Sequence, residues 1–198
     1  KPSSTLLNAN IERSLEAAVA HTVSRSGVTV AAQGTKTLDV GYTFPNTVLA
    51  TDSSNFLADE ALQAEHFGPV SLFVRCKSTA DLLAAIGRLD GNLTATVHTE
   101  PSETDMAAAV CAALREKVGR VIINGYPTGV EVVHAMHHGG PYPATTFPNA
   151  TSVGMTAIKR FMRPVAFQNM PDTLLPNALK AGNPLGFWRI VDNAYTHD

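Results

Sequence analysis

Three strand-like segments separated by two helix-like segments most constrain what this chain can fold into. Residues 70–76, 92–99 and 120–124 are apolar or β-branched runs of strand length. The intervening segments, 78–89 and 102–118, each begin with capping-box spacing and continue with apolar side chains at helical spacing. This order of elements is typical of a parallel sheet with right-handed crossovers. The sequence therefore predicts an α/β fold, an open and mostly parallel sheet with flanking helices.

Both flanks of this region add expected elements. Before it, a helix is expected to begin near Asn10 and to be followed by a strand over 28–32. After it the chain is richer in proline, and we expect a helix over 153–162, a short strand over 165–168 and a second helix from Pro171. An extended segment with an open edge is suited to pairing with another chain.

The size and charge balance of the chain exclude several protein classes. It has 198 residues, of which 44% are hydrophobic and 16% charged, and a formal net charge of −2. This composition supports a packed core and is unlike that of a disordered chain. No nucleic-acid partner is expected, because neutralising phosphates requires a basic surplus. The longest apolar run, 106–114, is shorter than the roughly 18 residues that a membrane span needs. We therefore expect a cytoplasmic protein without a membrane partner.

The last strand of the predicted sheet runs into a long loop, which we interpret as the functional face. Ligands of open parallel sheets bind beyond the carboxyl ends of the strands. The strand that ends at Asn124 is followed by a loop over 125–143 that is rich in glycine, proline and histidine. The sequence therefore predicts a ligand-binding or catalytic role for this loop.

Histidines in the loop allow two kinds of site. Glu131, His134 and His138 have i, i+3 and i+7 spacing, so on a helix they would share a face that could hold a metal ion. The His-Glu-x-x-His signature is absent, however, and Gly139 would end such a helix. We therefore expect no metal site and keep a metal hydrolase as the weakest hypothesis. A role for His138 in contacting a substrate or a nucleophile from a loop is favoured.

Neither of the two cysteines is predicted to be a nucleophile. Cys111 lies on the apolar stripe of its expected helix, where a buried thiol is inert. Cys76 closes a strand beside Lys77, with no partner base evident nearby. The residues by themselves thus indicate an α/β domain without a complete catalytic set. A non-catalytic domain that binds a nucleotide or a partner protein is one interpretation of that pattern.

An ordered set of motifs resembles the aldehyde dehydrogenase superfamily along nearly the whole chain. Residues 65–70, Glu-His-Phe-Gly-Pro-Val, are similar to the family's Glu-x-Phe-Gly-Pro motif, and residues 91–99 to its Gly-Leu-x-Ala-x-Val strand. Other segments look like a bacterial branch that contains the 2-oxoglutarate semialdehyde (2,5-dioxovalerate) dehydrogenases and NADP-linked fatty aldehyde dehydrogenases. These segments are 124–132, 138–145, 163–171 and 183–189.

The resemblance implies a division of the chain and a larger enzyme around it. Residues 1–162 would be part of the catalytic domain, and residues 163–198 an oligomerisation strand and C-terminal tail. The strand over 165–168 would pair with a neighbouring subunit of a homodimer or homotetramer. In the family the catalytic cysteine lies farther before the Glu-x-Phe-Gly-Pro motif than the 64 residues present here. The base glutamate, the oxyanion-hole asparagine and the cofactor domain lie farther upstream still.

We therefore expect the C-terminal portion of an NAD(P)-dependent aldehyde dehydrogenase, cut at residue 1 and inactive without its missing N-terminal part. The implied reaction oxidises an aldehyde, with 2-oxoglutarate semialdehyde as a candidate, to a carboxylic acid through a cysteine thiohemiacetal. In the resemblance, Glu65 accepts hydrogen bonds from the nicotinamide ribose of NADP or NAD, and Phe67 packs near the nicotinamide. His138 would lie beside the nucleophile and favour its thiolate.

Overall fold

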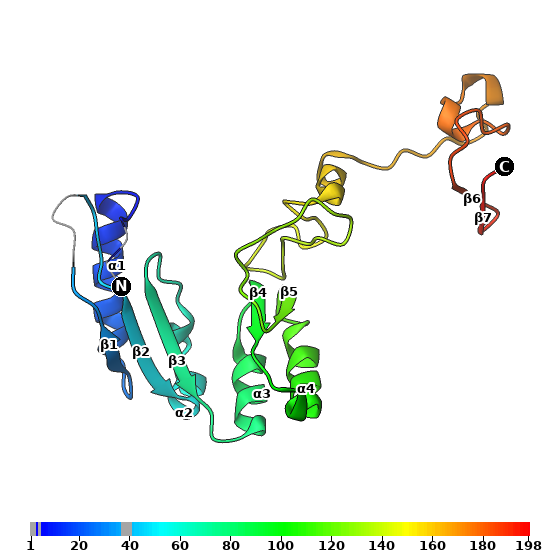
Figure 1. Ribbon diagram of the computed structural model, residues 1–198. Coiled ribbons are helices and arrows are strands. Elements are labelled where there is room, and N and C mark those ends of the chain that lie inside the picture. Colours follow the sequence, from blue (N-terminus) through cyan, green and yellow to red (C-terminus); the bar gives the residue numbers. More distant parts are fainter. Residues whose placement is uncertain (1–2, 4, 37–40) are drawn as a thin grey trace. The chain divides into compact units, whose positions relative to one another are not determined.

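The computed structural model describes residue 3, residues 5–36 and residues 41–198. The chain forms two compact units, Lys1–Ala157 and Ile158–Asp198, which are described separately (Figure 1). No helix in the described residues is long and apolar enough to cross a membrane.

The first unit begins with a helix against a three-stranded sheet. The side chain of Asn8 accepts hydrogen bonds from the amides of Asn10 and Ile11 and so caps the first helix. The strand order is β1-β2-β3, with β1 antiparallel to β2 and β2 parallel to β3. The elements are α1 (Ala9–Val23), β1 (Thr29–Gln33), β2 (Thr47–Asp52), α2 (Ser53–Ala58), a 3₁₀ helix (Glu60–Gln63) and β3 (Val70–Arg75).

Two further helices and two parallel strands follow. Ser78 accepts a hydrogen bond from the amide of Asp81 at 3.1 Å, so the predicted N-cap of α3 is confirmed. The fourth helix ends at Leu114 rather than near 118, because the amide of Lys117 closes a turn onto the Leu114 carbonyl and Val118 already begins a strand. The elements are α3 (Thr79–Arg88), β4 (Asn92–Val97), a 3₁₀ helix (Pro101–Glu103), α4 (Thr104–Leu114) and β5 (Val118–Ile123).

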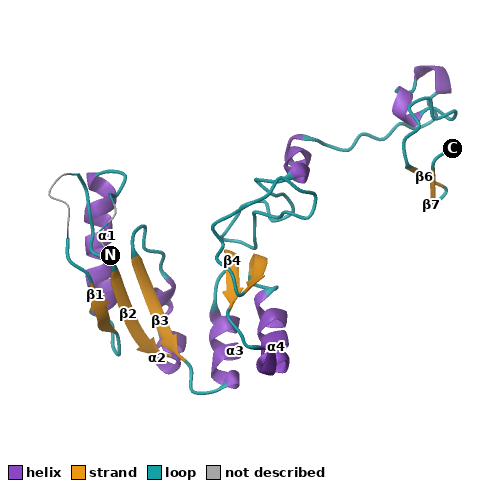
Figure 2. Cartoon of the chain, in the orientation of Figure 1, coloured by secondary structure: helices purple, strands orange, loops and turns teal. Residues whose placement is uncertain are grey.

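The predicted α/β class with parallel pairing is confirmed, but the single sheet is not. In the described residues β3 pairs only with β2, and β4 pairs only with β5 (Figure 2). The two sheets are joined through α3, whose neighbouring residues Ala85 and Ile86 belong to two different buried clusters. Ala85 packs with Phe56 of α2, whereas Ile86 packs with Val110 of α4. The helices α2, α3 and α4 therefore form a continuous layer, although the sheet is interrupted between β3 and β4.

A groove of about 750 Å³ separates the free edges of β3 and β4. Leu72 and Val74 of β3 line one side, and Leu93 and Thr94 of β4 line the other. The expected strand–helix–strand order is therefore present, but a groove lies where hydrogen bonds would join these two strands.

The second unit has little regular structure. The expected helix over 153–162 is a 3₁₀ helix (Met155–Phe161) that spans the boundary, and the helix expected from Pro171 is replaced by two 3₁₀ turns. No strand forms over 165–168, because a strand needs a hydrogen-bonded neighbour and this segment has none within the described chain. Asp192 and Asn193, both at positive φ, instead form a hairpin turn that the sequence analysis did not predict. The turns are Asp172–Leu174 and Asn177–Leu179, and the hairpin joins β6 (Arg189–Val191) to β7 (Ala194–Thr196).

Candidate functional site

The Glu-His-Phe-Gly-Pro loop, residues 65–69, is held against α1 immediately before β3. Nε2 of His66 lies 3.0 Å from the hydroxyl of Thr22, which is a buried residue of α1. A Cβ atom on Gly68 would lie only 2.2 Å from Cδ2 of Leu15, so glycine permits the loop to approach the helix. The loop is thus fixed to the helix on both sides of Phe67.

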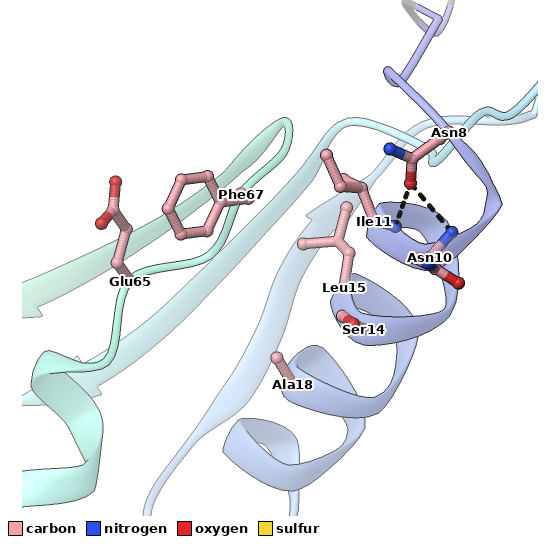
Figure 3. A pocket seen from close by; sticks show the side chains of 8 residues that line it. All are labelled: Asn8, Asn10, Ile11, Ser14, Leu15, Ala18, Glu65 and Phe67. Carbon is pink, nitrogen blue, oxygen red and sulfur yellow. Dashed lines mark hydrogen bonds between the residues drawn. The ribbon is translucent and has the colours of Figure 1, made fainter.

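A pocket of about 450 Å³ lies between this loop and the N-terminal half of α1 (Figure 3). Figure 3 shows Glu65 and Phe67 on the loop side, with Ile11 and Leu15 of α1 beside Phe67. The volume is within the range of about 300–1,000 Å³ that is typical of small-molecule sites. The lining residues are Asn8, Asn10, Ile11, Ser14, Leu15, Ala18, Glu65 and Phe67.

Sequence reasoning identified only the loop side of this pocket. Glu65 and Phe67, which belong to one sequence motif, both line it. The side chain of Phe67 is 68% exposed. Asn8, Asn10 and Ser14 were missed. The available signal was that the first turns of the helix carry three small polar side chains on the side adjacent to its apolar face. That signal does not reveal which distant loop they meet.

Glu65 also lines the groove between β3 and β4, where it is joined by Pro143 and Ala144 of the long loop. One residue of the predicted cofactor motif and two residues of the Gly/Pro/His loop region therefore line the same groove. Glu65 and Pro143 are more than seventy positions apart in the sequence, and both lie at the amino-terminal ends of the parallel strands.

The position of the loop differs from the expectation that it acts at the carboxyl ends of the strands. After β5 the chain turns back, and Arg120 fixes the turn by donating to the carbonyls of Pro127 and Gly129. Its His-Gly-Gly-Pro segment, residues 138–141, then lies against the starts of β4 and β5. A Cβ on Gly91 would lie 2.2 Å from the Pro141 carbonyl oxygen, and one on Gly119 would lie 2.1 Å from that of Gly139.

The carboxyl ends of β4 and β5 are joined to each other instead. Asn124 adopts a positive φ of 50°. Its side chain accepts from the amide of Thr99 and donates to the Thr99 carbonyl, both at 2.9 Å. The polar groups at this end are therefore used in a structural connection.

His138 is positioned by its backbone. Its amide donates to the hydroxyl of Thr151 at 2.8 Å, and its carbonyl accepts from the amide and the hydroxyl of Ser152. Nδ1 of His138 is buried and has no hydrogen-bond partner within the described residues. The ring thus presents an unsatisfied nitrogen on a backbone that is firmly held.

The helical arrangement that the metal-hydrolase hypothesis requires does not form. Residues 131–138 form bends and turns rather than a helix, so Glu131, His134 and His138 do not share a helical face. Glu131 and His134 are exposed, and no group of three metal-ligating side chains occurs in the part of the chain that the structure describes.

Cys76 is placed as a structural thiol. It packs against the buried cluster around Phe56, and its Sγ lies 4.0 Å from the carbonyl of Val74. Burial, with a smaller contribution from the nearby Asp81 carboxylate, raises the pKa of the Cys76 thiol. A raised pKa leaves less thiolate at neutral pH, and the thiolate is the reactive form.

We therefore expect iodoacetamide to modify Cys76 several-fold more slowly at pH 8 than it modifies an exposed cysteine in a peptide. The midpoint of the rate against pH should lie above the ordinary thiol value, because the folded protein disfavours the charged form. The measurement is mass spectrometry of a Cys111→Ser variant, which isolates Cys76. A midpoint below the ordinary value would contradict this assignment.

Comparison with known proteins connects these features to a family. The model of the "Aldehyde dehydrogenase family" matches residues 4–146. The chain is 49% identical over 137 residues to alpha-ketoglutaric semialdehyde dehydrogenase 2 of Azospirillum brasilense, covering 69% of this chain and 26% of that protein. It is 38% identical over 193 residues to alpha-ketoglutaric semialdehyde dehydrogenase of Acinetobacter baylyi, covering 98% of this chain and 37% of that protein.

The fold agrees with that relationship. The structure of an aldehyde dehydrogenase from Bacillus cereus (G224D mutant) matches 79% of this chain and 29% of its own length, with a TM-score of 0.59 and 23% identity. The chain thus spans about a quarter to two fifths of the length of these relatives. The chain belongs to the aldehyde dehydrogenase family.

Proposed function

We propose that this chain is the C-terminal portion of an enzyme that oxidises an aldehyde to a carboxylic acid with NAD or NADP, and that the aldehyde is 2-oxoglutarate semialdehyde. The observation that carries the proposal is the pocket between α1 and the Glu-His-Phe-Gly-Pro loop. The substrate is supported by the two relatives at 49% and 38% identity, which are named for that aldehyde under its older name.

The lining of the pocket fits a nicotinamide riboside. The carboxylate of Glu65 is an acceptor for sugar hydroxyls, and the Asn10 amide and Ser14 hydroxyl supply further polar contacts. Phe67 and Leu15 supply an apolar surface for a flat ring. A nicotinamide held there would supply the hydride acceptor for oxidation of the aldehyde. Glu65 and Phe67 would orient the ring and its ribose, which lowers the entropy cost of reaching the reactive geometry.

His138 is proposed to lie beside the catalytic cysteine, which belongs to the preceding part of the same enzyme. Its buried Nδ1 is unpaired in the described chain, so it is open to a partner supplied from outside these residues. An imidazole next to a thiol stabilises the thiolate and lowers the thiol pKa. In this role His138 prepares the nucleophile for attack on the aldehyde.

The preceding part of the enzyme is proposed to complete the sheet. The edges of β3 and β4 face one groove that is lined by apolar side chains from both strands. A parallel strand inserted there would pair with both edges and join the two sheets into one. We propose that residues upstream of this chain supply that strand, consistent with the 26% and 37% of the relatives' length that the chain spans.

Residues 163–198 are proposed to join subunits of a homodimer or homotetramer, whereas residues 1–162 belong to the catalytic domain. The segment over 165–168 has no strand partner within the described chain, and Val165 and Phe167 are 57% and 42% exposed. An unpaired apolar segment of this kind is suited to β-pairing between chains.

Replacing Glu65 by glutamine in the intact enzyme tests the proposed function. The change keeps the size of the side chain and removes its charge, and a hydrogen bond to a charged group contributes about 1.5–3 kcal/mol. We expect hydride transfer to slow by roughly 10- to 100-fold, measured as the rate of reduced-nicotinamide formation in a single turnover. Glu60→Gln, at an exposed residue of the 3₁₀ helix that precedes the loop, is the matched control and should leave the rate unchanged. An unchanged rate in Glu65→Gln would remove Glu65 from the site.

A further inference from the structure

We propose that His66 is a positioning residue, whose imidazole N–H bond to Thr22 sets the orientation of Glu65 and Phe67. This inference rests on the proposed function, since it concerns how the nicotinamide contacts are held. The hydrogen bond joins the loop before β3 to the last turns of α1, residues 44 positions apart in the sequence.

The direction of the hydrogen bond follows from the partners of Thr22. The Thr22 hydroxyl donates to the carbonyl of Ala18 at 3.0 Å, and a hydroxyl has only one proton to donate. With that proton directed to Ala18, the Thr22 oxygen accepts from the Nε2–H group of His66, at 3.0 Å. In this arrangement a replacement for His66 has to supply a donor at the same place.

The surroundings make this contact specific. Thr22 is 3% exposed, so its oxygen lies out of competition with bulk water. On the other side of Phe67, Gly68 approaches Leu15 of the same helix, so the loop is attached at two points. Leu15 and Ala18 also line the pocket. The carbonyl of Ala18 accepts the hydrogen bond from the Thr22 hydroxyl. The helix that forms one wall of the pocket therefore also anchors the opposite wall.

Loss of the His66 anchor leaves the loop attached to α1 only on the C-terminal side of Phe67, through Gly68 and Val70, and frees the segment that carries Glu65. Because one neutral hydrogen bond contributes about 0.5–1.5 kcal/mol, we expect His66→Ala to raise the KM for NAD(P) by roughly 3- to 10-fold in the intact enzyme. The KM for the aldehyde should not change. A general loss of folded protein would instead lower the apparent kcat and leave both KM values where they were.

Three further variants and a control separate positioning from a merely structural role. Thr22→Val keeps the shape of the side chain and removes the acceptor, so it should reproduce the effect of His66→Ala. The double variant should be no worse than either single variant, because both remove the same contact. His66→Gln keeps an N–H donor and should restore the KM to within about twofold of the parent. His21→Ala, an exposed histidine next to Thr22 on α1, is the matched control.

The outcomes distinguish this inference from the proposed function. Multiplicative effects in the double variant, or an unchanged nucleotide KM in His66→Ala, would overturn the role of His66. If Glu65→Gln slows hydride transfer while His66→Ala has no effect, only the inference fails. If neither variant has an effect, the proposed function fails with it. Two results together support the inference. Hydrogen exchange over residues 64–70 becomes faster in both His66→Ala and Thr22→Val, and the KM for NAD(P) rises in both variants without a further rise in the double variant.

Discussion

Replacement of Gly119 by alanine is expected to destabilise the protein by about 1–3 kcal/mol, the usual cost of forcing atoms into a packed site. The added Cβ would lie 2.1 Å from the carbonyl oxygen of Gly139 and 2.7 Å from its carbonyl carbon. These are backbone atoms, so no rotation of a side chain relieves the overlap. The loop that carries His138 must move away from the start of β5, and the intact enzyme should lose most of its activity.

A matched glycine provides the control. Gly87 lies within α3, and a Cβ there would meet nothing within 4 Å. Alanine at this position should stabilise the helix by about 0.5–1 kcal/mol, because glycine is a poor helix former. Denaturant unfolding of the two variants should therefore give shifts of opposite sign. A shift of the same sign and size in both would show that the approach of Gly139 to β5 is not a constraint.

Local patterns predicted the elements of the central region accurately. The cap at Ser78 and the apolar spacing of α3 are signals contained within a dozen residues, and both are found in the structure. The strand-like run over 70–76 is also a local signal, and it forms β3 in the structure. These predictions succeeded because helix and strand formation there depends on neighbours in the sequence.

Pairing between distant elements was not predictable in the same way. The strand–helix–strand order suggested that β3 and β4 are neighbours, yet β3 pairs with β2 alone in the described chain. Which edge a strand uses depends on backbone groups far away in the sequence. The same reason explains the missed half of the pocket, where Asn10 of α1 meets Phe67 across more than fifty residues.

The long loop shows why a general rule of topology can fail at a particular site. It does leave from the carboxyl end of β5, as expected, but Arg120 turns it back by binding two of its carbonyls. Gly119 then permits the return segment to lie against the start of the strand. Neither contact has a local signature, since an arginine and a glycine in a strand are ordinary residues.

A proline at the free edge of β4 is expected to have the second large effect, on assembly with the preceding part of the enzyme. The amide of Asn92 donates to the carbonyl of Lys117, so the backbone groups of Asn92 face β5. Backbone groups of successive residues in a strand point to opposite edges, so those of Leu93 face the groove. Proline at position 93 therefore removes a donor from the groove edge and leaves the pairing between β4 and β5 intact.

We expect Leu93→Pro to abolish the restoration of aldehyde oxidation when this chain is mixed with the separately produced preceding part of the enzyme. The unmodified chain should restore it. Leu93→Val keeps the N–H group and a strand-forming apolar side chain, and it should restore activity nearly as well. A central strand does not tolerate proline, whereas an edge strand does. Equal restoration by Leu93→Pro would therefore mean that β4 remains an edge in the whole enzyme and that no strand occupies the groove.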